Sequence, residues 1–473
     1  MGSSICGDID ARPHHVVLFP FMSKGHIIPI LHLTRLLLHR RLAVTIFTTQ
    51  ANHALITESL NDTSASILDL SFSHNVPNIP AGIESTEKLP SISLFHSFAN
   101  TTKVMQSDFE RALQTLPHVS FMVSDAFLWW TLESASKFNI PRLVFNGMSY
   151  YSLSISRAVA SDRLLFGAEL DDELITVTPF PWIRVTRNDF EPPFTEPEPK
   201  GLKFEFTMKA ITATKNSYGI IFNSFNELEP LFVDFWNRKY IPKAWSVGPL
   251  CLAEPPKVRN EARYNYKPIW VQWLDKKLEQ RNSVLYIAFG SQTQISPTQL
   301  KEIAIGLEES KVNFLWVIRK SESEISDDKF EERVKERGIL VREWVDQREI
   351  LMHETVQGFL SHCGWNSVLE SICAVVPILA WPMVAEQPLN ARMVVEEIKV
   401  GLRVETCNGS VRGFVKWEGL EKMVKELMEE EKGKEVRKKS KEVAQMAKKT
   451  MEEAGSSKCT LDLLVDEICG KKT

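Results

Sequence analysis

The segment that most constrains this chain is a short apolar run at residues 358–360, followed at once by a polar turn and a helical pattern. The turn covers residues 361–364, and apolar residues then recur at helical spacing up to Cys373. This order predicts a buried strand, a tight turn and the start of a helix. A helix N-terminus presents unpaired backbone N–H groups, and Gly364 allows a ligand to approach the backbone closely. The segment therefore predicts a binding site for a diphosphate.

Side chains near this turn suit the other parts of a nucleotide. His362, Asn366 and Ser367 supply neutral donors, and Glu370 lies one helical turn beyond Asn366. The Glu370 carboxylate can accept hydrogen bonds from a pair of ribose hydroxyls, and Trp344 offers a flat face for a base. His362 could instead be a core histidine bonded to the backbone, so the sequence leaves two possibilities for this residue.

Residues 344–387 resemble the 44-residue signature box of plant UDP-dependent glycosyltransferases, and the run HCGWNS at 362–367 is its most recognisable part. The resemblance extends to a Gly-His turn at 25–26, the run NSFNELE at 223–229 and the run FGS at 289–291. Asp346 departs from the family pattern, which usually has proline there. We expect this change to alter the loop locally without touching the ligand.

The resemblance implies a role for each matching residue. Trp344 would stack on uracil, the HCGWNS turn would hold the diphosphate, and the end of the box would bind the hydroxyls of the sugar. The implied donor-binding residues are Ser291, Trp344, Val345, Gln347, His362, Gly364, Trp365, Asn366, Ser367, Glu370, Glu386 and Gln387. Trp365 could serve packing alone. Gln387 accompanies a preference for glucose in relatives, so UDP-glucose is the expected donor, with galactose, xylose and rhamnose as alternatives.

Two residues in the first half of the chain are candidates for acid–base chemistry. His26 follows an apolar run at 15–20, and Asp125 ends another at 121–125. Ligands of parallel α/β sheets bind at the carboxyl ends of the strands, where both residues fall. An imidazole can take a proton from an attacking acceptor while a carboxylate orients the ring. A structural histidine and a strand-end cap are the alternatives, but His26 matches the catalytic histidine of the family.

The resemblance also implies the reaction and its acceptors. Phenols and flavonoids are the commonest acceptors of the family, and we expect a pocket that uses Phe21, Met22, Phe95, Phe98 and Asn146. Attack in line with the departing diphosphate inverts the configuration of the anomeric carbon. Three rivals remain open: C-glycosylation by the same base, a sugar-nucleotide epimerase and a UDP-sugar-binding protein without turnover.

The length of 473 residues favours two domains, and strands that alternate with helical patterns favour parallel sheets covered on both faces. The resemblance implies the α/β arrangement called GT-B, with two facing Rossmann-like domains. We expect an acceptor-binding domain at 1–250, a linker at 251–268, a UDP-sugar-binding domain at 269–454, and a C-terminal helix at 455–473 that packs back on the first domain. The proline-rich residues 179–199 are expected to form a surface loop.

Composition excludes several other classes of protein. A formal net charge of −4 shows no basic footprint for nucleic acid, and the Lys-rich run at 432–449 alternates with Glu as in a solvated helix. Seven scattered cysteines predict reduced thiols, and the Asp-x-Asp pair, Asp8 and Asp10, falls in an expected mobile tail. We therefore expect no metal, no cofactor and no membrane segment, in a soluble cytoplasmic monomer.

Overall fold

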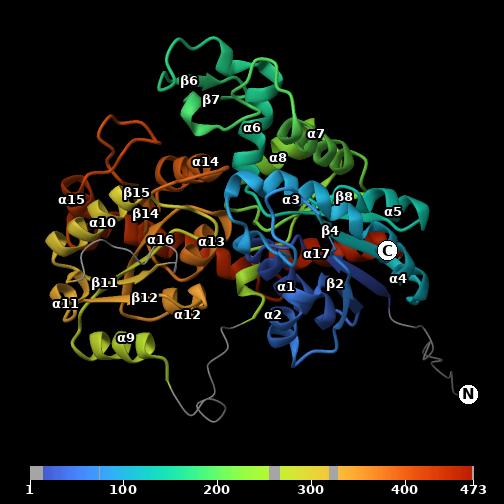
Figure 1. Ribbon diagram of the computed structural model, residues 1–473, viewed down its shortest axis with the longest axis horizontal. Coiled ribbons are helices and arrows are strands. Elements are labelled where there is room, and N and C mark those ends of the chain that lie inside the picture. The colour runs from blue at the N-terminus through green and yellow to red at the C-terminus, as the bar shows by residue number, and fades with distance from the viewer. Residues whose placement is uncertain (1–13, 74, 255–266, 319–328, 471–473) are drawn as a thin grey trace, which may run out of the picture. The chain divides into compact units, whose positions relative to one another are not determined.

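The computed structural model describes residues 14–73, 75–254, 267–318 and 329–470 (Figure 1). Most of the expected linker, and the expected tail with Asp8 and Asp10, lie outside the described residues. Contacts divide the described chain into two units. Unit 1 contains the described residues up to Phe145, the segment Lys209–Ile221 and the described residues from Asp462 onward. Unit 2 contains Asn146–Met208 and Phe222–Leu461.

The first sheet has the strand order β3-β2-β1-β4-β5-β8-β9. Its strands are β1 (His15–Phe19), β2 (Ala43–Thr49), β3 (Ser66–Leu70), β4 (Val119–Asp125), β5 (Arg142–Asn146), β8 (Gly219–Phe222) and β9 (Ala244–Ser246). Strand β1 pairs in parallel with β2 and β4, and β5 pairs in parallel with β4. The strand order therefore changes direction between β1 and β4.

The second sheet has the order β12-β11-β10-β13-β14-β15, and all its pairs are parallel. Its strands are β10 (Val284–Ala288), β11 (Asn313–Val317), β12 (Gly338–Val341), β13 (Val356–Ser361), β14 (Ile378–Ala380) and β15 (Gly401–Arg403). Here the order changes direction between β10 and β13. In such doubly wound sheets, ligands bind at this switch point, outside the carboxyl ends of the strands.

The helices alternate with these strands, as the sequence predicts (Figure 1). The first eight are α1 (Lys24–His39), α2 (Gln50–Leu60), α3 (Phe95–Thr101), α4 (Gln106–Thr115), α5 (Thr131–Lys137), α6 (Tyr150–Asp162), α7 (Leu202–Lys215) and α8 (Pro230–Lys239). The others are α9 (Ile269–Glu279), α10 (Pro297–Ser310), α11 (Phe330–Val334), α12 (Gln347–Leu351), α13 (Trp365–Cys373), α14 (Gln387–Arg392), α15 (Trp417–Met428), α16 (Glu431–Thr450) and α17 (Ser456–Ile468). Across the described ranges, no helix combines the length and the apolar character that crossing a bilayer requires.

Strand β10 shows how the second sheet is covered on both faces. Leu285 and Ile287 belong to one hydrophobic cluster, together with Leu300 and Leu307 of α10. Val284, Tyr286 and Ala288 belong to another cluster, which contains Trp270 and Leu274 of α9 and Ile350 and Leu351 of α12. Successive side chains of a strand point to opposite faces, so an uninterrupted apolar run is what a strand between two helical layers needs.

Three features differ from the sequence-based expectation. Strand β7 (Phe180–Val185) pairs antiparallel with β6 (Ile175–Val177), whereas we expected a loop over the proline-rich segment. Two prolines within 179–185 led us to expect a loop, although Phe180, Ile183 and Val185 are apolar residues that the strand buries. Strands β3 and β15 were also missed, because one is largely exposed and the other has three residues.

Candidate active site

His26 lies in the first turn of α1, which begins at Lys24 rather than after the expected turn. The difference has a tertiary cause, because the Glu87 carboxylate accepts a hydrogen bond from the Lys24 backbone N–H at 2.7 Å. Glu87 thus satisfies one of the donors that a helix start leaves unpaired. The sequence around the turn gives no sign of this partner, which lies 63 residues further along the chain.

Asp125 ends β4, and Nδ1 of His26 lies 2.7 Å from its Oδ2. The other oxygen, Oδ1, accepts a hydrogen bond from the backbone N–H of Phe127 at 2.9 Å. The carboxylate is 1% exposed, and the strands β1 and β4 bring the two residues together where the strand order of the first sheet changes direction. With Nδ1 donating to Asp125, Nε2 is the basic nitrogen of a neutral ring.

Aromatic side chains surround the His26 ring. Phe21 and Phe127 lie 5.5 Å and 5.0 Å from it, measured between ring centroids. Phe95 and Phe98 both contact Phe21, at 5.7 Å and 6.1 Å. Phe21 and Phe98 are fully buried, whereas Phe95 and Phe127 are partly exposed and supply the accessible aromatic surface.

The remaining two expected acceptor residues have other surroundings. Met22 is buried, and its backbone carbonyl accepts a hydrogen bond from Thr86. Asn146 ends β5, and its Oδ1 accepts a hydrogen bond from the Met148 backbone N–H at 2.9 Å. The sequence-based set omitted Phe127, although its place two residues after a strand-end aspartate is the signal that could have found it.

In unit 2, the turn between β13 and α13 stands at the switch point of the second sheet. Cys363 adopts a left-handed backbone with φ of 62°, and Gly364 is the N-cap of α13. This geometry directs the first N–H groups of the helix away from the sheet. A helix start of this kind favours a bound anion.

The His362 ring occupies the space between two glycines. A Cβ added to Gly290, in the turn after β10, would lie 2.6 Å from Nε2 of His362, and one added to Gly364 would lie 2.7 Å from it. Burial lowers the pKa of His362 to about 4. The ring is therefore neutral at pH 7. Ser291 directly follows Gly290 in the same turn.

Gln347, at the start of α12, connects two residues of α13 that we expected to bind the donor. Its Nε2 donates to Ser367 Oγ at 2.9 Å and to Glu370 Oε2 at 2.7 Å, and the Tyr286 hydroxyl donates to its Oε1 at 3.3 Å. Burial raises the pKa of Glu370 to about 7, although the hydrogen bond from Gln347 opposes this shift. The sequence gives no indication of Tyr286, which a separate strand contributes.

Adjacent residues at the start of the signature box differ in exposure. The Trp344 side chain is 58% exposed, whereas Val345 is buried in the cluster beneath β10. Asp346, the departure from the family pattern, is the N-cap of α12 and accepts a hydrogen bond from Arg348 N at 3.0 Å. Aspartate is a favoured N-cap residue, which accounts for its tolerance at this position.

At the far end of the box, Gln387 organises the loop after β14. Its Oε1 accepts hydrogen bonds from the backbone N–H groups of Met383 at 3.0 Å and Val384 at 2.9 Å. Glu386 is the N-cap of α14, and its Oε1 lies 3.5 Å from Nδ2 of Asn390. The amide nitrogen of Gln387 is the end of the side chain that remains to donate to a ligand.

Trp365 and Asn366 bind the NSFNELE segment. The Trp365 indole N–H donates to the Asn223 carbonyl at 2.7 Å, and Nδ2 of Asn223 donates to Asn366 Oδ1 at 3.3 Å. The Trp365 side chain is buried, so it holds the turn in place from within the protein. The sequence left open whether Trp365 serves packing alone, and its burial and its contact with Asn223 are those of a packing residue.

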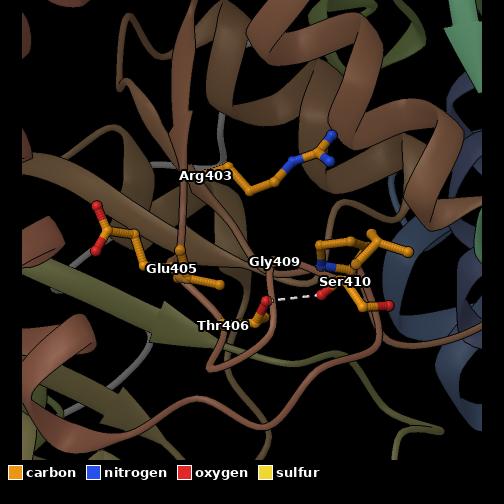
Figure 2. A pocket seen from close by; sticks show the side chains of 8 residues that line it. Arg403, Glu405, Thr406, Gly409 and Ser410 are labelled. Atoms are coloured by element: carbon orange, nitrogen blue, oxygen red, sulfur yellow. Dashed lines mark hydrogen bonds between the residues drawn. The ribbon is translucent and has the colours of Figure 1, made fainter. Parts of the chain in front are cut away.

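A separate cavity of about 360 Å³ lies beyond the carboxyl ends of β14 and β15. Figure 2 shows the loop that lines it, closed by a hydrogen bond from Thr406 Oγ1 to the Ser410 carbonyl at 2.8 Å. The lining residues are Pro382, Arg403, Val404, Glu405, Thr406, Gly409, Ser410 and Val411. None of them belongs to the expected donor or acceptor set. Among the described residues, no group of three His, Cys, Asp or Glu side chains could hold a metal.

Comparisons with known proteins agree with this geometry. Residues 275–443 match the UDP-glucoronosyl and UDP-glucosyl transferase family. UDP-glycosyltransferase 90A1 of Arabidopsis thaliana is 55% identical over 98% of each chain. The chain belongs to the plant family 1 UDP-glycosyltransferases. The glycosyltransferase therefore has the GT-B fold of two Rossmann-like domains, and a UDP-sugar is its co-substrate.

Solved structures of relatives support the same assignment. Glycyrrhiza uralensis UGT73P12, complexed with glycyrrhetinic acid 3-O-monoglucuronide, matches with a TM-score of 0.86 and 30% identity, over 97% of this chain and 96% of that one. Phytolacca americana UGT2, complexed with UDP-2fluoro-glucose and pterostilbene, matches with a TM-score of 0.77 and 27% identity, over 96% and 99% of the two chains. Membership of this family favours the transferase over the epimerase and over a binding protein without turnover.

Proposed function

We propose that this glycosyltransferase moves glucose from UDP-glucose to a hydroxyl of a small aromatic acceptor, with inversion at the anomeric carbon. The observation that carries the proposal is the 2.7 Å contact between His26 Nδ1 and Asp125 Oδ2 inside an aromatic setting. Phe95 and Phe127 would receive a flat apolar acceptor, supported from behind by Phe21 and Phe98. Met22 and Asn146 complete the proposed acceptor-binding set.

In the proposed reaction, Nε2 of His26 takes the proton of the acceptor hydroxyl. The acceptor oxygen forms a bond to C1 of the sugar, and the bond between C1 and the diphosphate oxygen breaks with its electron pair on UDP. Asp125 stabilises the imidazolium that forms. Because Asp125 is buried and held by Phe127 N–H, it keeps the ring in one orientation.

The donor would bind along the signature box. Trp344 has the exposed face that stacking on uracil requires, and Glu370 would accept the ribose hydroxyls once it is ionised. The N-terminus of α13, with Ser291, neutral His362, Asn366 and Ser367, would spread the charge of the departing diphosphate. Glu386 and the amide nitrogen of Gln387 would bind the hydroxyls of glucose. The solved complex of a relative with UDP-2fluoro-glucose and pterostilbene contains a comparable pair of ligands.

Incubation with UDP-glucose and a panel of phenols, scored by mass gain, tests the proposal. We expect a hexose product, and a loss of about 10²-fold to 10⁴-fold in kcat for His26→Ala. Asp125→Asn should also reduce kcat while UDP binding stays unchanged, because neither residue belongs to the signature box. A rate unaffected by His26→Ala would refute the assignment of the base. A product that resists acid hydrolysis would show that a carbon atom of the acceptor attacks instead of an oxygen atom. Faster turnover with another UDP-sugar would show that glucose is not the preferred sugar.

A further inference from the structure

Arg142 is a buried cation that contacts the backbone of Asp125, the partner of His26. It is the first residue of β5, which lies beside β4, and it is 2% exposed. Every described contact of its guanidinium is made with residues of unit 1. A buried charge costs several kcal/mol unless it is paired and hydrogen bonded. We therefore asked what a buried and fully hydrogen-bonded arginine contributes at this position besides packing.

The guanidinium binds the segment that follows Asp125. Nη2 donates to the backbone carbonyls of Asp125 at 3.3 Å and Leu128 at 3.4 Å. Nε donates to Ser124 Oγ at 2.7 Å and to Thr131 Oγ1 at 2.9 Å. These contacts span the residue before Asp125 to the first residue of α5. The planar guanidinium thus fixes the backbone that aims the Asp125 carboxylate.

A third segment of the chain holds Arg142 from the other side. Nη1 donates to Ser217 Oγ at 2.7 Å, and Ser217 lies in the part of unit 1 that follows α7. Burial lowers the pKa of Arg142 to about 9, while the negative charge of Asp125 opposes this shift. The guanidinium therefore remains charged at pH 7.

The charge of Arg142 matters because the partner of Asp125 changes charge during the proposed reaction. A neutral His26 leaves Asp125 as a buried anion, and a protonated His26 supplies a positive charge. Two other charged pairs lie on the elements around it: Lys24 lies beside Glu87 at the start of α1, and Glu133 on α5 pairs with Lys103 at 2.9 Å. Arg142 interacts with the charge of Asp125, and its own charge does not change with the state of the ring.

We propose that Arg142 is a positioning residue, which rests on the proposed function of His26 and Asp125: it holds the Asp125 segment and places a fixed positive charge beside it. Removing a nearby positive charge raises the proton affinity of the pair, whichever of the two groups takes the proton. The pair would then be protonated at a higher pH, and less of the base would be available near neutrality.

The pH profile of kcat/KM tests this role. Arg142→Met should move the acid limb of the profile to higher pH by about one unit. Arg142→Lys keeps the charge and should restore most of the position of the limb, but not all of kcat, because a single ammonium cannot replace the contacts that Nε, Nη1 and Nη2 make together. Arg35→Met is the matched control, since Arg35 is a buried arginine on α1 that pairs with Asp62 at 2.7 Å. It should leave the limb in place.

Thermal unfolding gives a readout that does not depend on activity. Arg142→Met removes the positive charge beside the buried Asp125, so adding Asp125→Asn should raise the melting temperature above that of Arg142→Met alone. A double variant no more stable than Arg142→Met, or an Arg142→Met enzyme whose acid limb does not move, would overturn the proposal. If His26→Ala retained full activity, the assignment of His26 as the base would be wrong. The melting temperatures would still show whether Arg142 and Asp125 are coupled.

Discussion

Gly290 and Gly364 are the two residues that decide how the His362 ring packs beside the turn between β13 and α13. Gly290 has φ of +77°, a backbone conformation that other L-residues rarely adopt, and the His362 ring fills the space next to it. Either glycine, if replaced by a residue with a side chain, would push directly on Nε2 of His362. The FGS and HCGWNS runs therefore depend on each other, although 72 residues separate Gly290 from His362.

We expect Gly290→Ala to weaken UDP binding by about tenfold or more, because the new Cβ displaces His362, and calorimetric titration with UDP measures this effect. Gly82→Ala is the control, since Gly82 has a similar φ of +81° but no atom within 4 Å of an added Cβ. Its strain should cost about 1 kcal/mol of stability and leave UDP affinity unchanged. Equal losses of affinity in both variants would show that backbone strain alone is responsible.

At the scale of elements, the NSFNELE segment braces α13. Asn223 binds Trp365 and Asn366 at the start of this helix, and Glu229 closes the segment on itself. Glu229 is fully buried, with its carboxylate accepting hydrogen bonds from Ser224 Oγ and from the Tyr151 backbone N–H. Burial raises the pKa of Glu229 to about 7, partly opposed by these bonds.

This raised pKa predicts a pH dependence of stability. A carboxyl group whose pKa is higher in the folded state binds its proton more tightly there than in the unfolded state. Its contribution to the free energy of unfolding is therefore fully present below pH 4.5 and is lost as the pH rises to about 7. Glu229→Gln should remove up to roughly 3 kcal/mol of this dependence. Glu227→Gln, at an exposed position, is the control. Urea unfolding between pH 4.5 and pH 8 measures how the free energy of unfolding depends on pH. The same dependence in Glu229→Gln as in the original protein would show that Glu229 is not its source.

At the scale of the whole molecule, unit 1 is discontinuous in sequence. It takes in Lys209–Ile221 and the described residues from Asp462 onward, as well as the N-terminal strands. Arg40 of α1 pairs with Asp462 of α17 at 2.5 Å, and the Tyr218 hydroxyl donates to Glu467 at 3.2 Å. The stability of the unit that carries His26 therefore depends on the last helix of the chain.

Leu464 and Leu463 of α17 provide a direct test of this dependence. Leu464 is 1% exposed and Leu463 is 58% exposed, on adjacent positions of one helix. Leu464→Ala should lower the free energy of unfolding by about 2 to 4 kcal/mol, whereas Leu463→Ala should change it by less than about 0.5 kcal/mol. Chemical denaturation of both variants makes the comparison. Similar small effects would mean that α17 contributes little to the unit.

The sequence by itself determined the alternation of strands and helices, the doubly covered strand β10 and the turn before α13, because periodicity and turn chemistry are local properties of the chain. The resemblance to a known family identified that turn as part of the signature box. It also placed Asp125 at a strand end and His26 in the segment that follows another strand, on the side of the sheet where parallel strands bind ligands. Only the tertiary structure decided which residues support them. Glu87 starts the helix of His26, Arg142 holds the segment of Asp125, and Tyr286 holds Gln347, since each of these contacts joins elements that are far apart in the sequence.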